Sequence, residues 1–313
     1  MIEAPNADRL LVGELGRWLE AQAPVHAEAR AESRRRLKKA QIGFFLLCFA
    51  CTPAIAFPQF PWPILLAPIF AYAYQAYQWV NAPKDEARGA VKTRANEAIA
   101  DALGMEYRAD LPGSELHEMA LAYDMVPKAD LVAFEDAWWG DAGSYALYLH
   151  EAHLERYVKG GTETLFRGVM LAIRFDRSFH GTTLVAPHGA FKRMARGERD
   201  TLDLDGKSLS RTQIANADFE DRFDVYTTDP TEAHRLMNPT YVRRIFETED
   251  TYGGGLKGML FTGGEVLMVA ESHDLFESGS LDPVEVRNNV RETVEQIAAV
   301  CGFALTLNRT RLD

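Results

Sequence analysis

The feature that most constrains this chain is a run of 44 residues, Ala40–Pro83, that contains no Asp, Glu, Lys or Arg. The prolines of the segment FPQFPWP, residues 57–63, remove backbone donors and fix φ, so one continuous helix is not expected. At about 1.5 Å per residue, the two halves, 40–57 and 62–80, each approach the thickness of a bilayer core. The sequence therefore predicts a transmembrane hairpin over residues 40–82. A buried soluble hairpin and a re-entrant loop are the alternatives.

Basic and aromatic residues flank the predicted hairpin. Because Lys and Arg concentrate on the cytoplasmic side of membrane helices, we expect both the N- and the C-terminus in the cytoplasm and a multi-pass topology. The basic residues before the hairpin are expected to contact the membrane surface, or only to set the topology: Arg34, Arg35, Arg36, Lys38 and Lys39. Trp62 and Trp79, at the two ends of the second span, are predicted interface anchors.

The charge and cysteine content of the chain limit its class. The formal net charge of −11 argues against nucleic-acid binding, because phosphate contacts need a basic surface. The charge is uneven, since residues 1–39 carry 8 Lys and Arg against 6 Asp and Glu, and the remainder carries 26 against 39. Three cysteines are too few for a disulfide framework in a chain of this length.

The parts outside the hairpin are residues 1–39 and 83–313. The first is predicted to be a cytoplasmic amphipathic helix, because apolar residues recur at three- and four-residue spacing between Leu10 and Leu19. The second is predicted to be a cytoplasmic α+β domain with a largely antiparallel sheet and flanking helices, because hairpin signals outnumber crossovers. Predicted helices cover residues 85–108, 114–123, 129–138, two short segments after Asp229 and Asn238, and 283 to about 300. Predicted strands cover residues 145–156, 164–175, 182–187, 223–228, 256–261 and 266–271, with hairpin turns at Gly160-Gly161 and at 262–265.

Few residues stand out as candidates for chemistry. Glu135 and Asp136, with Asp141 nearby, form the densest acidic spot before the predicted strands. Paired carboxylates can perform acid–base work or hold a hard cation, although they also make helix ends and solvated faces. Glu135 and Asp136 are therefore the candidate catalytic residues. No cofactor and no metal site is predicted.

Three further motifs are interpreted as structural. Cys48 and Cys51 lie one helical turn apart in the first span, and without a second pair or a His they are expected to be small apolar residues. His150 and His153 are three residues apart, whereas a zincin helix needs four, and on a strand they point to opposite faces. Gly253-Gly254-Gly255 precedes a strand, whereas a phosphate-binding loop precedes a helix.

Several short motifs follow one another between Val126 and Leu307. They are Phe134-Glu135-Asp136 with Gly140 and Gly143, Leu165–Gly168, Phe175 with Phe179-His180-Gly181, Phe219–Tyr226, Thr231-Glu232-Ala233 and Asp274–Glu277. In this order they resemble a bacterial membrane-protein family known as a domain of unknown function, family 3137. The resemblance implies two apolar segments ahead of the domain and, with the flanking charges, a place in the bacterial inner membrane. It brings no activity and no functional residues.

The sequence alone does not specify an activity. The favoured hypothesis is a membrane-anchored module on the cytoplasmic face that binds or scaffolds a protein partner or a small ligand. A membrane-tethered enzyme with an unrecognised site is the alternative. An oligomeric transport component is favoured less, because no ionisable residue lies in the predicted spans. The expected partners are the lipid bilayer and, besides it, a protein or further copies of this chain, but no nucleic acid.

Overall fold

The structure, a computed structural model, describes residues 7–55, 62–142, 145–175, 178–192, 200–251, 255–273 and 275–309. The chain divides into two compact units. The sheet unit contains Asn96–Glu277 and the residues from Glu292 onward, and the helical arm contains Asn6–Ala95 and Ser278–Arg291. Each unit is described by itself below.

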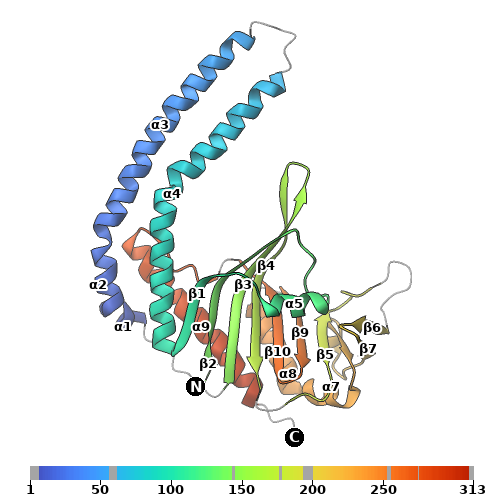
Figure 1. The fold of residues 1–313 in the computed structure, drawn as a ribbon. Coiled ribbons are helices and arrows are strands. Elements are labelled where there is room, and N and C mark those ends of the chain that lie inside the picture. The colour runs from blue at the N-terminus through green and yellow to red at the C-terminus, as the bar shows by residue number, and fades with distance from the viewer. Residues whose placement is uncertain are drawn as a thin grey trace. The chain divides into compact units, whose positions relative to one another are not determined.

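The sheet unit is built on one sheet, and the described strands pair in the order β1-β2-β3-β4-β10-β9-β5-β8-β7-β6 (Figure 1). All of these pairs are antiparallel. The predicted α+β class with an antiparallel sheet is thereby confirmed. The strands are β1 (Met105–Leu111), β2 (Leu131–Ala142), β3 (Tyr145–Val158), β4 (Gly161–Arg174), β5 (Thr183–Pro187), β6 (Thr201–Leu204), β7 (Lys207–Thr212), β8 (Phe223–Thr227), β9 (Leu256–Thr262) and β10 (Glu265–Glu271).

Both faces of this sheet are covered. On the central strand β4, Met170 and Ala172 belong to the hydrophobic core beside α5 (Glu115–Ala122), whereas Leu171 and Ile173 are buried on the opposite face. Figure 1 shows α5 and α9 (Pro283–Arg309) on opposite faces of the sheet. Because successive side chains of a strand point to opposite faces, this sheet has a hydrophobic core on each face and no face fully exposed to solvent.

Local sequence signals set the ends of several elements. Asp229 caps α7 (Pro230–Leu236) by accepting hydrogen bonds from two backbone amides, and Asn238 does the same for α8 (Pro239–Thr251). Both predicted short helices are confirmed, and a third, α6 (Ala217–Glu220), precedes β8. Gly160 (φ +104°) joins β3 to β4 and Gly263 (φ +58°) joins β9 to β10, as the two predicted hairpins require.

The helical arm consists mainly of two long helices. After α1 (Ala7–Val12) and α2 (Glu14–Ala21), α3 runs over Ala23–Ile55, and α4 runs over Trp62–Leu103, with its residues up to Ala95 in the arm. The Tyr72 hydroxyl donates to the carbonyl of Ala40 at 2.8 Å. A Cβ atom on Gly43 would lie 2.1 Å from that hydroxyl oxygen. The position of the Tyr72 hydroxyl against α3 therefore depends on a glycine.

Some predicted elements are wrong. Residues 129–138, predicted as helix, lie largely in β2, where the register shifts between Glu135 and Trp138. The helix predicted over 85–108 is the end of α4, which stops at Leu103 because Gly104 adopts φ +69°, and β1 follows. Strands β6 and β7 were not predicted. The single N-terminal helix predicted before residue 40 is instead α1, α2 and the first part of α3, which continues past residue 40 without a break.

The predicted transmembrane hairpin is not supported by the structure. Over the residues it describes, no helix combines the length and the apolar character that crossing a membrane requires. The side chains of residues 52–66, Trp62 among them, lie outside the description.

Candidate functional site

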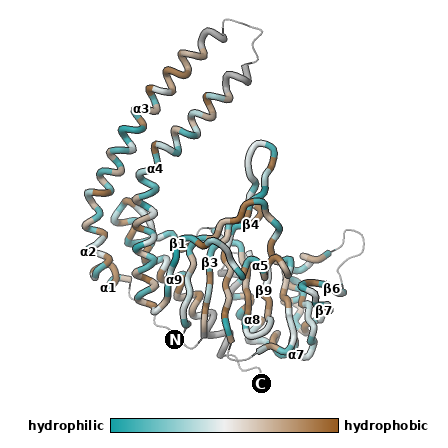
Figure 2. Tube along the Cα trace, viewed as in Figure 1, coloured by the Kyte–Doolittle hydropathy of each residue, from teal (hydrophilic) through white to brown (hydrophobic). Residues whose placement is uncertain are grey.

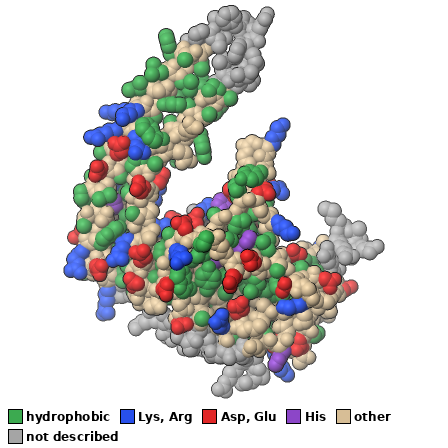
Figure 3. All heavy atoms as spheres, in the orientation of Figure 1, with side chains coloured by type: hydrophobic (Ala, Val, Ile, Leu, Met, Phe, Trp, Pro, Cys, Tyr) green, Lys and Arg blue, Asp and Glu red, His purple; other side chains and the backbone are tan. Residues whose placement is uncertain are grey.

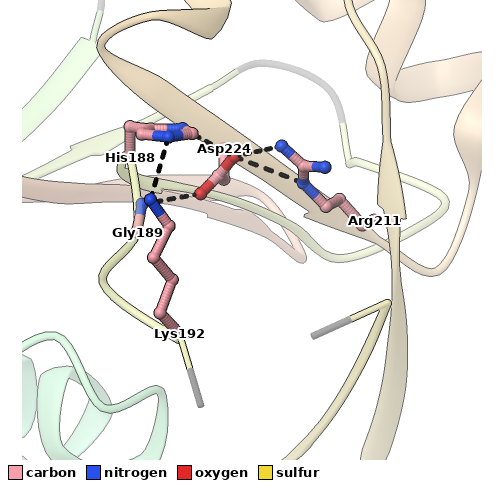
Figure 4. Close-up of polar contacts among 5 residues, drawn as sticks. All are labelled: His188, Gly189, Lys192, Arg211 and Asp224. Atoms are coloured by element: carbon pink, nitrogen blue, oxygen red, sulfur yellow. Dashed lines mark hydrogen bonds and ion pairs between the residues drawn. The ribbon is translucent and has the colours of Figure 1, made fainter. Parts of the chain in front are cut away.

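A cluster of polar side chains surrounds Asp224 in the sheet unit (Figure 4). Asp224 is the second residue of β8, a strand whose five residues are all buried, and its side chain is only 1% exposed. A buried carboxylate is costly unless donors surround it. The donors lie on β7 and in the turn after β5, the two strands that flank β8 in the sheet.

Asp224 accepts hydrogen bonds through both carboxylate oxygens. Arg211, on β7, donates to Oδ1 from Nη2 at 2.6 Å and from Nε at 3.2 Å. The Nδ1 atom of His188, just after β5, lies 3.3 Å from the same oxygen. The backbone amide of Gly189 donates to Oδ2 at 2.9 Å. Three hydrogen bonds and the contact with His188 therefore surround the buried carboxylate.

The turn after β5 places a second cation beside His188. Gly189 adopts φ +79°, and hydrogen bonds from Ala190 to Pro187 and from Lys192 to Gly189 close the turn. A Cβ atom on Gly189 would meet the end of the Lys192 side chain at 3.0–3.1 Å. Glycine thus permits both the left-handed backbone and the return of Lys192, whose Nζ lies 3.2 Å from His188 Nε2.

This arrangement fixes the orientation of the His188 ring. Because Nδ1 lies beside the Asp224 carboxylate, Nε2 is the ring nitrogen on the side of Lys192 (Figure 4). A carboxylate behind a His is an arrangement used for proton transfer and for ligand binding. Asp224 itself is covered, whereas His188 and Lys192 are exposed. The groups that the cluster presents to solvent are therefore basic.

Comparison with known proteins places this cluster in a family. Residues 164–309 match the model of the family described as protein of unknown function (DUF3137). The match covers less than half of the chain. The resemblance to family 3137 inferred from the sequence is thereby confirmed for this segment, whereas its bacterial and membrane aspects stay predictions. The whole Asp224 cluster lies within the segment. The motifs around Phe134 and Gly140 precede the matched residues.

Other comparisons add no function to the DUF3137 segment. No curated protein matches the chain in sequence. Among solved structures, the crystal structure of the mycobacterial trehalose monomycolate transport factor A, TtfA, is similar at a TM-score of 0.35 and 13% identity, over 66% of this chain and 94% of that chain. A TM-score this low establishes neither a shared fold nor a shared role.

The two predicted catalytic candidates are not brought together. Glu135 is exposed, whereas Asp136 is 1% exposed and occupies the bulge of β2 with φ +50°. The Tyr107 hydroxyl donates to Asp136 Oδ1 at 2.5 Å. Burial, with the charge of Asp136 second, raises the pKa of Tyr107 far above its ordinary value, so the phenol stays protonated. The paired-carboxylate geometry that motivated the prediction is absent at these two positions, and no observation tests a catalytic role for either.

The histidines of β3 point to opposite faces, as the strand pattern predicts. His150 is fully buried, and its Nδ1 donates to the backbone oxygen of Glu151 at 3.0 Å. Its Nε2 therefore accepts from the Ser114 hydroxyl, at 2.5 Å. His153 instead lies 3.1 Å from the Thr164 hydroxyl. Among the described residues, no group of three or more His, Cys, Asp or Glu could hold a metal ion.

The other sequence motifs are also placed. Cys48 and Cys51 are half-buried on α3 and carry free thiols. Cys301 is buried, and burial raises the pKa of its thiol to about 11. Gly255 is described and accepts a backbone hydrogen bond from Glu271, whereas the two preceding glycines lie outside the described residues.

The predicted membrane-surface residues lie on α3 next to a group of exposed apolar side chains. Arg34, Arg35, Lys38 and Lys39 are exposed, and Arg36 donates to the backbone oxygen of Trp79 at 2.9 Å. Figures 2 and 3 show hydrophobic residues along the parts of α3 and α4 beyond these basic side chains. The large exposed ones are Ile42, Phe44, Phe45, Leu46 and Phe49 on α3, and Phe70, Tyr74, Tyr77 and Trp79 on α4.

Sequence reasoning missed the Asp224 cluster. His188, Lys192, Arg211 and Asp224 are spread over 37 positions and match no motif. They meet only because β8 pairs with both β5 and β7. One signal was available: Asp224 lies inside the predicted strand 223–228, and an acidic residue there must find a cation or donor if the strand is buried.

Proposed function

We propose that this chain is a binding module held at a lipid bilayer by the apolar side chains of its helical arm. The observation that carries the proposal is the exposure of nine large apolar side chains within the uncharged run, which reaches 76% at Phe49 and 72% at Phe45. Exposed apolar surface on this scale marks a membrane or protein contact. Transferring one such side chain out of water is worth about 1.5–3 kcal/mol, so four together supply roughly 6–12 kcal/mol.

The basic residues beside this surface favour a bilayer over a protein as its contact. Arg34, Arg35, Lys38 and Lys39 are exposed immediately before the apolar positions of α3. Arg36 also lies over the ring of Trp79, with its guanidinium carbon 5.3 Å from the centroid. A belt of basic and tryptophan side chains bordering an apolar region is typical of the membrane interface, where anionic headgroups attract each cation by about 1 kcal/mol. The same charges favour the cytoplasmic leaflet.

The sheet unit supplies the binding function in this proposal. The described residues hold no constellation of nucleophile, base and cofactor that we can assign to catalysis, and the Asp224 cluster is a polar site with exposed basic groups. The same apolar arm could instead bind further copies of this chain. Self-association is therefore the competing outcome of the experiment.

Flotation with phosphatidylcholine vesicles tests the membrane contact. We expect the intact protein to float with neutral vesicles in high salt, because apolar transfer is not screened by ions. Phe45→Asp with Phe49→Asp should leave most of the protein in the dense fraction, since one charge within an apolar membrane segment costs about 2.5–3.5 kcal/mol. Val132→Asp with Val158→Asp is the matched control, because these side chains of the sheet unit are 42% and 41% exposed and the pair adds the same two charges.

Three results would contradict the proposal. They are a wild-type protein that does not float, an arm variant that floats like wild type, and a sheet-unit control variant that is lost equally. If the arm variant differs from wild type only in sedimentation without vesicles, the apolar surface binds other copies of the chain instead of lipid.

A further inference from the structure

A groove lies in the helical arm between α3 and α4, along which the chain runs in opposite directions (Figure 1). Its volume is about 530 Å³, which falls within the range of about 300–1,000 Å³ typical of small-molecule sites. All of its lining residues belong to the arm, so the groove is contained in one compact unit. Its larger apolar and aromatic side chains are Leu37, Phe44 and Phe45 on α3, and Tyr72, Tyr77 and Val80 on α4.

The walls of this groove are apolar because polar groups in it are bonded within the arm. The Tyr72 hydroxyl donates to the carbonyl of Ala40 at 2.8 Å, and the Asn81 side-chain amide donates to the carbonyl of Tyr77 at 3.0 Å. Phe45 and Tyr77 are nevertheless 72% and 66% exposed, so these walls are not part of a packed core. Exposed apolar surface of this kind marks a contact with a ligand, a membrane or another protein.

The charge of the groove is confined to one end and has one sign. Arg34 and Lys84 line the groove, and no acidic residue is among the described residues that do so. Arg34 lies near the start of the part of α3 that lines the groove, and Lys84 lies at the end of the corresponding part of α4. Because the two helices are antiparallel, both cations lie at the same end.

These two cations are not neutralised by neighbouring carboxylates. Glu32 pairs with Arg36 at 3.1 Å, and Asp85 pairs with Arg88 at 3.2 Å. Within the described part of the chain, neither of the two groove cations forms an ion pair. The groove therefore combines an apolar length with a positively charged end.

We propose that the groove binds one acyl chain of an anionic phospholipid, whose phosphate lies on Arg34 and Lys84. From Arg34 to Phe45, at about 1.5 Å per residue, the groove extends for roughly 16 Å, which a fatty acyl chain can cover. The phosphate oxygens accept from the guanidinium and the ammonium, and both of these hydrogen bonds are charge-assisted. An apolar groove with two cations at one end is complementary to an amphiphile with an anionic head.

This inference rests on the proposed function and deepens it, because it names the lipid class that the arm selects. Contact with a bilayer through exposed apolar side chains requires neither a particular headgroup nor a fixed number of lipids. A groove with a charged end requires both. The selectivity and the stoichiometry of lipid binding therefore test the groove separately from the membrane contact.

Native mass spectrometry of the intact protein in detergent, titrated with phosphatidylglycerol, is the first measurement. We expect one lipid per chain, bound at least tenfold more tightly than phosphatidylcholine, in which a choline cation offsets the phosphate charge. Arg34→Gln with Lys84→Gln should remove this preference. Arg17→Gln with Arg88→Gln is the matched control, because it removes two charges from exposed positions of the same arm outside the groove. The control should bind within twofold of wild type.

A second pair of variants tests whether the acyl chain occupies the groove. Ala76 lines the groove, so Ala76→Trp fills part of it and should weaken phosphatidylglycerol binding at least tenfold. Ala71→Trp is the matched control, because Ala71 is exposed on the same helix and does not line the groove. It should bind like wild type. Equal binding by the two tryptophan variants would overturn the placement of the acyl chain.

Other results would overturn the lipid site as a whole. They are no retained phosphatidylglycerol, equal retention of the two lipids in variable number, and equal weakening by the groove variant and its charge-matched control. A dimer without lipid would assign the groove to a second copy of the chain. Flotation of the wild-type protein on neutral vesicles reports the membrane contact separately, so this inference and the proposed function can fail independently.

Discussion

Lowering the pH from 7 to 4 directly tests how the sheet unit buries His150. This side chain is fully buried between Ser114 and the backbone of β3. Burial is the main cause that lowers its pKa from 6.5 to about 4; the nearby His117 lowers it further, and the hydrogen bond to Glu151 opposes the shift. The folded protein therefore holds His150 neutral at a pH where the unfolded chain takes up a proton.

The sign and size of the effect follow from this difference. Above pH 6.5 the ring is neutral in both states, and its contribution to stability is fully present. As the pH falls from 6.5 toward 4, the unfolded state binds a proton that the folded state does not, and that contribution is lost. One pKa unit corresponds to 1.36 kcal/mol, so the loss amounts to about 3 kcal/mol by pH 4. This is a large part of the 5–15 kcal/mol that a folded protein has.

Urea unfolding followed by tryptophan fluorescence measures the loss, because Trp138 of the sheet unit is fully buried. The free energy of unfolding of wild type should fall more steeply between pH 6.5 and 4 than that of His150→Gln, by about 3 kcal/mol. A His150→Gln protein with the wild-type pH dependence, or a wild type with none, would refute the reasoning.

Three further substitutions test packing and capping. Gly168→Ala would place a Cβ 2.0 Å from the backbone oxygen of Ala270, so we expect a loss of about 1–3 kcal/mol or more in unfolding free energy, measured by urea. Gly43→Ala meets only the tip of the Tyr72 side chain, which can move. The loss of stability, measured as helical thermal unfolding by circular dichroism, should therefore be smaller than that of Gly168→Ala, about 1 kcal/mol. A loss equal to or larger than that of Gly168→Ala would contradict the reasoning. Asp229→Ala removes the cap of α7 and should lower the free energy of unfolding in urea by about 1 kcal/mol. Asp229→Asn should stay close to wild type, because asparagine also caps helices. An alanine variant as stable as wild type would contradict the role of the cap.

The parts of the sheet that could be predicted are those with an uninterrupted local signal. β9 and β10 are short apolar runs joined by a glycine turn, and α7 starts with an Asp-Pro pair, so local chemistry alone determines them. β2 fails for a physical reason. Its bulge places Asp136, Ala137 and Trp138 in consecutive buried positions, so the alternation by which a strand is recognised is lost there.

Other misses had a signal that was not used. Asp205-Gly206 joins β6 to β7 with both residues at positive φ, and Asp-Gly is a strong hairpin signal. Gly104 ends α4 in the left-handed conformation typical of a helix end. The predicted boundary between residues 39 and 40 was wrong for a different reason. The residues change there from charged to apolar, but the backbone stays helical, and α3 continues through the boundary.

The segment from Leu275 to Glu277 shows how residues of a short sequence motif can have a structural role. Phe276 has φ +57°, which is unusual for a bulky residue and costs on the order of 1–3 kcal/mol. Side chains from three distant parts of the chain hold this backbone: Glu151 accepts from the amide of Leu275, Gln296 accepts from that of Phe276, and Asn96 donates to the Phe276 carbonyl. The Phe276 ring is fully buried against Trp138. The strain is therefore offset by packing and hydrogen bonds that link β3, α4 and α9. In sequence these contacts are 20 to 180 residues apart, so this role could be recognised only from the structure.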